Sequence, residues 1–208
     1  MPALRLPTLW PSWLTRPLEL RIDVEQPGGK PLQEQLTPLY DRLKTPGDRL
    51  HGIPEIGLNH PDLVIRWREA DGEFYVYVED RRSGQLAGYT VFNRLIEVDR
   101  RADRLLRSPH SKYDERYQRR GLATAVYRWG LDAGLCLMTG ARQSPGAHAL
   151  WHKLARHYAW GYADLRDKTL THLGQDISPQ QRDDLHTRMF LLGRPWQLEQ
   201  FAAAVQMR

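Results

Sequence analysis

The chain has 208 residues, of which 41% are hydrophobic and 26% are charged. This composition is typical of a soluble globule with one domain, or one domain plus an appendage, and excludes a disordered chain. The lone Cys136 excludes a disulfide framework and a cysteine-based zinc site. No apolar run reaches the roughly 18 residues that cross a bilayer, so we expect a cytoplasmic protein without membrane association.

The net charge is +5, and 25 arginines stand against 5 lysines. Guanidinium groups favour planar, bidentate anions such as phosphate and carboxylate. A genomic bias toward arginine gives the same ratio, and net charge alone does not choose between the two explanations.

The first predicted elements are a proline-rich arm over residues 1–17 and an alternating, half-buried strand over 18–24. Apolar residues on one helical face then predict a helix over 32–43, which Pro38 distorts. Residues 44–61 carry several glycines and prolines, so we expect a loop there.

Three strands joined by short turns are predicted over 62–69, 73–80 and 85–98, which indicates an antiparallel sheet. Segment 100–107 is ambiguous between helix and strand, and a strand that ends near Tyr113 should follow it. Beyond residue 121 the hydrophobic period becomes that of a helix, which Gly134 ends.

The second half of the chain is expected to add a buried strand over 135–138 and a helix with Ser144 as its N-cap. A strand over 162–165, a helix from Asp176 to Leu192 and a helix over 196–205 complete the prediction. The fold class is therefore α/β (α+β), a mixed, mostly antiparallel central sheet flanked by helices. We expect one domain over 1–165 and a helical C-terminal extension over 166–208.

The segment between the Tyr113 strand and the following helix carries the strongest chemical signal. A helix start leaves amides unpaired and adds partial positive charge. Gly121 and the small Ala123 let a ligand approach the main chain, and Arg119 and Arg120 add formal charge. These features favour a pyrophosphate cradle. Neither GxxxxGK[ST] nor GxGxxG is present, so an NTPase P-loop and a dinucleotide-binding Rossmann site are not indicated.

Two motifs carry a resemblance to a known family. Gln118-Arg-Arg-Gly121-Leu-Ala123 matches the pattern Q/R-x-x-G-x-G/A. Ser144-Pro-Gly-Ala-His-Ala-Leu-Trp151 is similar to N-x-x-A-x-x-hydrophobic-Y, with Ser for Asn and Trp for Tyr. On these motifs and the order of elements between them, the chain resembles the GNAT superfamily of acyl-CoA N-acyltransferases over roughly residues 62–165.

The resemblance implies an N-acetyltransferase that uses acetyl-CoA, or another acyl-CoA, and no metal. The enzyme would acetylate a primary amine of a small molecule or a protein. The pantetheine arm would run beside the Tyr113 strand, and Ser144 would reach it, although Ser144 serves equally well as an N-cap. The implied cofactor contacts are Tyr113, Gln118, Arg119, Arg120, Gly121, Leu122, Ala123, Thr124, Ser144 and Trp151.

The acid and the base are less well defined. Many family members protonate the leaving thiolate with a Tyr at the position of Trp151, whose indole is far too weak an acid. Packing in the core is the competing interpretation of Trp151. As bases for the amine, Glu97 and His110 are candidates, although a surface position without a catalytic role explains each of them better. We expect Asp114, at the turn, to be solvated.

Other functions stay open. The same fold acting on a nucleic-acid-borne amine, such as charged tRNA or a base, is an alternative that we do not favour, and a non-catalytic binding module is another. Apolar residues after 184 could cover a cleft or form a homodimer. His148 and His152 lie one helical turn apart, but a third ligand is missing from the pattern, so no metal site is predicted.

Overall fold

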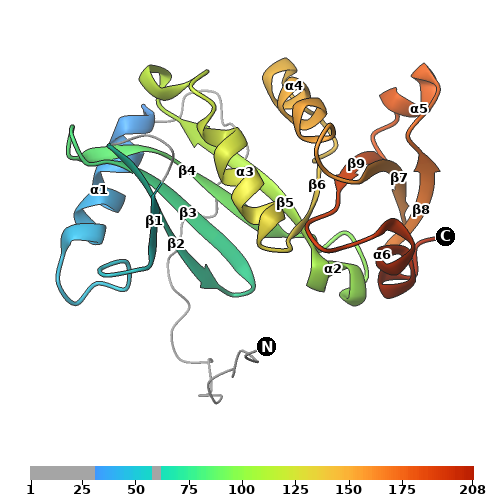
Figure 1. The fold of residues 1–208 in the computed structure, drawn as a ribbon, viewed down its shortest axis with the longest axis horizontal. Coiled ribbons are helices and arrows are strands. Elements are labelled where there is room, and N and C mark those ends of the chain that lie inside the picture. The colour runs from blue at the N-terminus through green and yellow to red at the C-terminus, as the bar shows by residue number, and fades with distance from the viewer. Residues whose placement is uncertain (1–30, 58–61) are drawn as a thin grey trace, which may run out of the picture. The chain divides into compact units, whose positions relative to one another are not determined.

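The computed structural model of the protein describes residues 31–57 and 62–208. The predicted arm over 1–17 and the predicted strand over 18–24 lie outside these residues. Within the described ranges, nine strands form one sheet in the order β1-β2-β3-β4-β5-β6-β9-β7-β8 (Figure 1). All of its pairings are antiparallel except that of β5 with β6. The expected mixed, mostly antiparallel sheet flanked by helices is confirmed.

The strands of this sheet have the following bounds: β1 (Glu55–Gly57), β2 (Leu63–Ala70), β3 (Glu73–Asp80), β4 (Gln85–Arg94), β5 (Leu106–Tyr113), β6 (Cys136–Met138), β7 (Trp160–Arg166), β8 (Thr169–Gly174) and β9 (Thr187–Leu191). The helices are α1 (Leu32–Lys44), α2 (Arg100–Leu105), the short 3-10 helix η1 (Glu115–Tyr117), α3 (Leu122–Asp132), α4 (Pro145–Leu154), α5 (Pro179–Asp183) and α6 (Leu198–Val205).

The N-terminal half follows the sequence closely. The three predicted antiparallel strands are β2, β3 and β4, and the turn between β2 and β3 places Asp71 and Gly72 at positive φ. Helix α1 keeps Pro38 inside it and packs its buried leucines against β4. The segment over 44–57, which the sequence predicted as a loop, also contains the three-residue edge strand β1. The ambiguous segment 100–107 divides into α2 and the start of β5.

Helices cover both faces of the sheet (Figure 1). Helices α3 and α4 pack on one face over a core that includes Val126, Leu137 and Trp151. Helices α2 and α6 lie on the other face, over a core that includes Leu106 and Phe201. Because side chains alternate between the faces along a strand, β6 contributes Leu137 to the first core and Cys136 and Met138 to the second.

The predicted C-terminal extension over 166–208 is not wholly helical, because it contains the strands β8 and β9 as well as the helices α5 and α6. A helix does begin at Ser178, where Ser178 and Gln181 form a reciprocal capping box, but it ends at Asp183 instead of Leu192. Asp184 then takes an extended conformation, and its side chain accepts a hydrogen bond from the main-chain N–H of His186, which favours a turn.

The residues that follow form β9, which lies between β6 and β7 in the middle of the sheet. The apolar residues of this segment fit a helical period and a strand period about equally well. The segment forms a strand and not a helix because its main chain pairs with β6 on one side and with β7 on the other. Strand β8, which the sequence did not indicate, pairs with β7, so the segment 166–208 adds two strands to the sheet.

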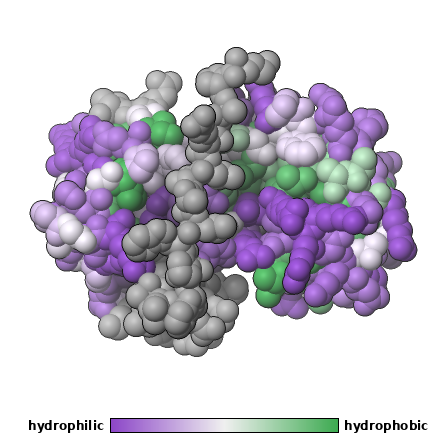
Figure 2. Space-filling model, turned by 90° about the horizontal axis from the view of Figure 1, so that it is seen from below, coloured by the Kyte–Doolittle hydropathy of each residue, from purple (hydrophilic) through white to green (hydrophobic). Residues whose placement is uncertain are grey.

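Hydrophilic residues predominate on the face that Figure 2 presents. Among the described residues only two large apolar side chains are classed as exposed, Ile96 and Leu185. None of the described helices combines the length and the apolar character that a membrane span requires.

Candidate functional site

The sheet opens between β5 and β6. These two parallel strands pair only at positions 106–107 and 136–137. Strand β5 continues to Tyr113, whereas β6 ends at Met138. The second half of β5 therefore has β4 on one side and no strand among the described residues on the other.

The main chain of β5 presents hydrogen-bonding groups to this open edge. The N–H of Asp114 donates to the carbonyl of Ala87 at 3.0 Å. Since hydrogen-bonded pairs alternate along an antiparallel ladder, His110 turns its main-chain groups toward β4. Ser111 and Tyr113 turn theirs toward the open edge. An extended ligand can pair there as an additional strand would.

Helix α3 begins beside this edge without a capping side chain. Gly121 is its N-cap, in the left-handed region at φ 80°, and a Cβ there would meet nothing within 4 Å. The first main-chain bond of the turn runs from the N–H of Ala125 to the carbonyl of Gly121. The amides of residues 122–124 thus have no partner within the helix, and an anion suits such a helix start.

The loop in front of α3 is anchored by Tyr117, which precedes the first motif and belongs to neither of the two. Its buried side chain donates a hydrogen bond to Asp80 at 2.6 Å and accepts one from Gln85 at 3.0 Å. The guanidinium groups of Arg120 and Arg116 lie over its ring, at 5.4 and 5.7 Å from the centroid. Tyr117 thus holds the loop and two of its cations in place.

Asp114 provides a second anchor, contrary to the expectation that it would be a solvated turn residue. Its carboxylate accepts hydrogen bonds from Arg116 at 2.8 Å and from Gln33 of α1 at 2.6 Å. The hydrogen bond from Arg116, with a smaller contribution from Gln33, lowers the pKa of Asp114 to about 2. The carboxylate therefore stays ionised at neutral pH and fixes the start of the loop.

The end of β5 is tied into a chain of hydroxyl groups. Gln118 donates to the carbonyl of Tyr113 at 2.9 Å and so folds the loop back onto the strand. The Tyr113 hydroxyl lies 3.0 Å from Thr90, which lies 2.7 Å from Ser111, and Ser111 contacts Tyr127 of α3 at 3.4 Å. Burial raises the pKa of both phenols, that of Tyr127 to about 12. Both are therefore weak proton donors at neutral pH.

The two predicted bases lie on the face opposite α3. His110 lies four residues after Leu106 on β5, so both side chains point to the same face, and Leu106 belongs to the core under α2 and α6. The Nε2 atom of His110 is shielded from solvent. Glu97 has a side chain that is 60% exposed and lies 3.6 Å from the guanidinium of the buried Arg188. Their catalytic roles stay predictions.

The second motif falls on the start of α4. Ser144 is the N-cap, and its Oγ accepts a hydrogen bond from the N–H of Ala147 at 3.2 Å. Trp151 is only 3% exposed and packs edge-on against Tyr127. The core-packing interpretation therefore describes its place in the fold, and contacts of Trp151 or Ser144 with a cofactor stay predictions.

The histidines of α4 lie as the sequence predicted, with 3.1 Å between the Nε2 atoms of His148 and His152. Across the two described ranges, no three side chains of the types His, Cys, Asp and Glu gather where they could hold a metal ion. The thiol of Cys136 lies in the core, and burial raises its pKa to about 11.

The known proteins that this chain is similar to are solved structures. No family model and no curated protein matches the sequence. A spermidine N-acetyltransferase chimera from Vibrio cholerae and a human enzyme matches with 17% identity and a TM-score of 0.33, over 59% of this chain and 68% of that one. A ribosomal-protein-S5-alanine acetyltransferase from Vibrio fischeri matches with 10% identity and a TM-score of 0.38, over 69% and 99%.

A ribosomal-protein α-N-acetyltransferase in complex with coenzyme A matches with 12% identity and a TM-score of 0.33, over 58% of this chain and 60% of that one. At these scores the likeness carries no argument about activity. By their names, the three solved structures are N-acetyltransferases.

Proposed function

We propose that this chain is a GNAT-type N-acyltransferase that transfers an acetyl group from acetyl-CoA to a primary amine by direct attack in a ternary complex. The observation that carries the proposal is the uncapped start of α3 beside the open edge of β5. A long ligand with a pyrophosphate at one end of a peptide-like arm fits both features at once. The loop motif, the main-chain edge and the adjacent positive charge meet at one place.

In this proposal the pyrophosphate binds the amides of residues 122–124. Arg119 and Arg120, both exposed beside the cradle, supply the positive charge that the anion needs. Arg119 is itself in the left-handed region at φ 59°, so its carbonyl and N–H are oriented by the loop. The pantetheine arm extends along β5 and pairs with the main-chain N–H of Tyr113 and the carbonyl of Ser111, which also face the open edge.

The chemistry requires three further groups. The amine nitrogen bonds to the thioester carbon, the carbon–sulfur bond breaks, and CoA leaves as its thiolate. The main-chain N–H of Ser111 points to the open edge and can donate to the developing oxyanion. His110 or Glu97 takes the proton of the amine. The indole N–H of Trp151 is far too weak an acid to protonate the thiolate, so that proton comes from solvent or from another group.

The test is thermal unfolding of the purified protein with and without acetyl-CoA. At about 100 times its dissociation constant the ligand stabilises the folded state by roughly 2.7 kcal/mol, which raises Tm by roughly 5–10 °C at this chain length. The variant Gly121→Glu places a carboxylate at the cradle and should lose this shift. No rise in the wild type at millimolar acetyl-CoA would overturn the proposal.

Gly52→Glu is the matched control. Gly52 also has a positive φ, 71°, and also leaves open space for a Cβ, but it lies in the turn after α1. Both variants therefore add one negative charge and a comparable backbone strain. Only Gly121→Glu should abolish the acetyl-CoA shift, whereas Gly52→Glu should keep it.

A further inference from the structure

A cavity of about 630 Å³ lies beyond the C-terminal end of β6. One wall is the loop of residues 140–143, which leads from β6 to α4. The other walls come from α4, α5, β7 and the start of β9. None of the lining residues belongs to the cradle at α3. The volume is in the range of small-molecule sites in proteins.

The floor of the cavity is apolar. Tyr162 and Met189 are buried in the core beneath it, with 7% and 2% exposure. Leu185 stands at its side with half of its surface exposed, although it is a large apolar residue. A ligand with an apolar group would cover this surface and gain the free energy of its burial.

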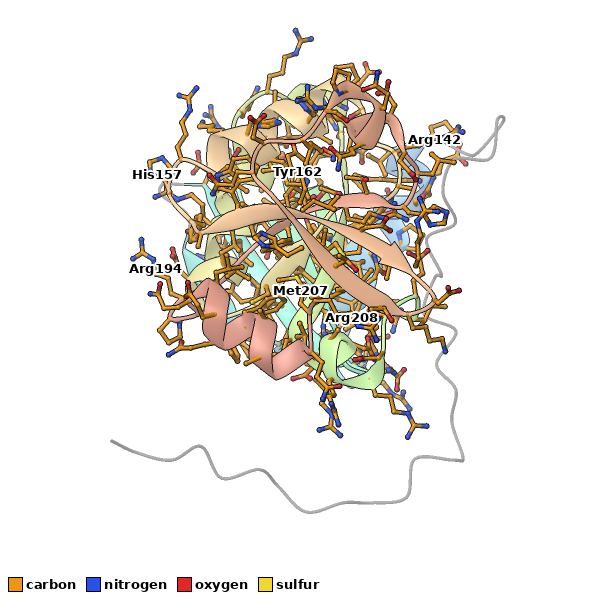
Figure 3. All side chains as sticks on the ribbon, turned by 90° about the vertical axis from the view of Figure 1, so that its right-hand side faces the viewer. Arg142, His157, Tyr162, Arg194, Met207 and Arg208 are labelled. Carbon is orange, nitrogen blue, oxygen red and sulfur yellow. The ribbon has the colours of Figure 1, made fainter. Side chains whose placement is uncertain are left out.

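The rim of the cavity is cationic. Arg142 and Arg182 both line it, and within the described part of the chain neither guanidinium makes a hydrogen bond or an ion pair. Nearby Arg166, by contrast, is neutralised by Asp164 and Asp184 at 3.0 and 2.5 Å. Figure 3 views the molecule from the right-hand side of Figure 1, where α5, β7 and β8 lie, and it labels Arg142 and Tyr162, which come from different walls of the cavity.

One lining residue has the opposite charge. Among the described residues that line the cavity, Asp183 is the only one with a carboxylate, and it follows Arg182 directly in α5. Two free guanidinium groups favour a carboxylate, which they can bind in a planar, bidentate way. A lone carboxylate beside them favours an ammonium group. The combination fits a zwitterion better than a simple anion.

We propose that this cavity binds the acyl acceptor, and that the acceptor is a small amine with a carboxylate and an apolar side group, as in an apolar amino acid. This rests on the proposed function. The loop of residues 140–143 follows β6, the strand that pairs with β5 where the open edge begins. Arg142 and Arg182 hold the carboxylate, Asp183 attracts the ammonium group, and the floor contacts the apolar group.

The test is isothermal titration of the full chain without acetyl-CoA. The probes are L-phenylalanine, 3-phenylpropionate, 3-phenylpropionamide and phenylphosphonate. L-Phenylalanine should bind most tightly and 3-phenylpropionate more weakly, because the second lacks the ammonium group. The neutral amide should bind at least about tenfold more weakly than 3-phenylpropionate, since it cannot pair with guanidinium. Tighter binding of the phosphonate than of either carboxylate would overturn the assignment.

The variant that carries the test is Arg142→Gln with Arg182→Gln, which should weaken L-phenylalanine by at least about tenfold. The double variant Arg100→Gln with Arg156→Gln removes two exposed charges outside the cavity and should bind like the wild type. Asp183→Asn should weaken L-phenylalanine but not 3-phenylpropionate. Equal binding by the first double variant, or no binding of any probe by the wild type in the millimolar range, would overturn the proposal.

Failure of this proposal and failure of the acyltransferase assignment have separate readouts. The first double variant leaves the cradle at α3 intact, so its Tm should still rise with acetyl-CoA. If amino-acid binding fails while that rise persists, the cavity assignment falls alone. If the acetyl-CoA rise is absent in the wild type, the role of the cavity as an acceptor site falls as well.

Discussion

The hydroxyl of Tyr117 donates to the carboxylate of Asp80 at 2.6 Å, and this bond ties the loop in front of α3 to the turn after β3. The two residues are 37 positions apart in the chain. An exposed loop loses conformational freedom when it binds a ligand, and a loop that is already anchored loses less. The bond therefore links the packing of the hairpin to the affinity of the cradle.

Tyr117→Phe should weaken acetyl-CoA binding several-fold, because it removes this bond and leaves the ring in place. It should also lower the free energy of unfolding by about 1 kcal/mol. Tyr75→Phe is the control, since the Tyr75 hydroxyl bonds Glu73 at 2.8 Å on β3, away from the loop. Titration with acetyl-CoA should separate the two variants, and equal affinities would show that the anchor does not act on the cradle.

Asp114 should make stability depend on pH in the acid range. Its pKa is about 2 in the folded state, against about 3.9 for an unperturbed aspartate. Because the folded-state pKa is the lower one, the stabilisation is complete above about pH 4 and is lost as the pH falls toward 2. Asp114→Asn should therefore be destabilised relative to the wild type at neutral pH and should approach it near pH 2.

Unfolding by urea across this range measures the effect. Glu115→Gln removes the neighbouring, exposed carboxylate and should follow the wild-type curve. If the difference in unfolding free energy between Asp114→Asn and the wild type stays constant down to about pH 2, the ion pair with Arg116 does not carry the stabilisation.

Local signals explain why the two motifs could be placed from sequence. The start of α3 at Gly121 and the Ser144 cap before α4 are decided by a few neighbouring residues, and both are found where expected. The hairpins of β2, β3 and β4 are equally local, since turn residues and alternation fix them. These features needed no information about distant parts of the chain.

The features that the sequence did not predict depend on contacts between residues that are far apart in the chain. Strand β9 exists as a strand because β6 and β7 flank it, and nothing within five residues of sequence distinguishes it from a helix. The anchors Tyr117 and Asp114 act through Asp80 and Gln33, which no local pattern connects to them. The cavity likewise brings the loop of residues 140–143 against α5, about forty residues later in the chain.

Glu79 should be among the residues of β3 most sensitive to substitution. Its side chain is 1% exposed and accepts hydrogen bonds from Lys44 of α1 and Arg66 of β2, each at 2.5 Å. Burial alone would raise the pKa of Glu79, but these two bonds outweigh it and lower the pKa. Glu79→Gln leaves two partly exposed cations facing a neutral group, which should cost about 1–3 kcal/mol of unfolding free energy.

The control for Glu79→Gln is Glu69→Gln, at an exposed position of the neighbouring strand β2. Surface substitutions of this kind change stability by less than about 0.5 kcal/mol. Denaturant unfolding of both variants should give midpoints that differ clearly. Similar midpoints would mean that Lys44 and Arg66 find other partners when the carboxylate is lost.

The histidine pair of α4 should destabilise the protein as the pH falls below neutrality. Burial, together with the charges of His148 and Arg182, lowers the pKa of His152. The unfolded chain takes up this proton near pH 6.5, whereas the folded state resists it, so the stability is full above about pH 6.5 and declines below it. His148→Gln removes one of the charges and should reduce the decline between about pH 7 and about pH 5. His157→Gln changes an exposed position beyond the end of α4, and the stability of this variant should decline as that of the wild type does. An equal decline in the stability of all three proteins would exclude the histidine pair as the cause.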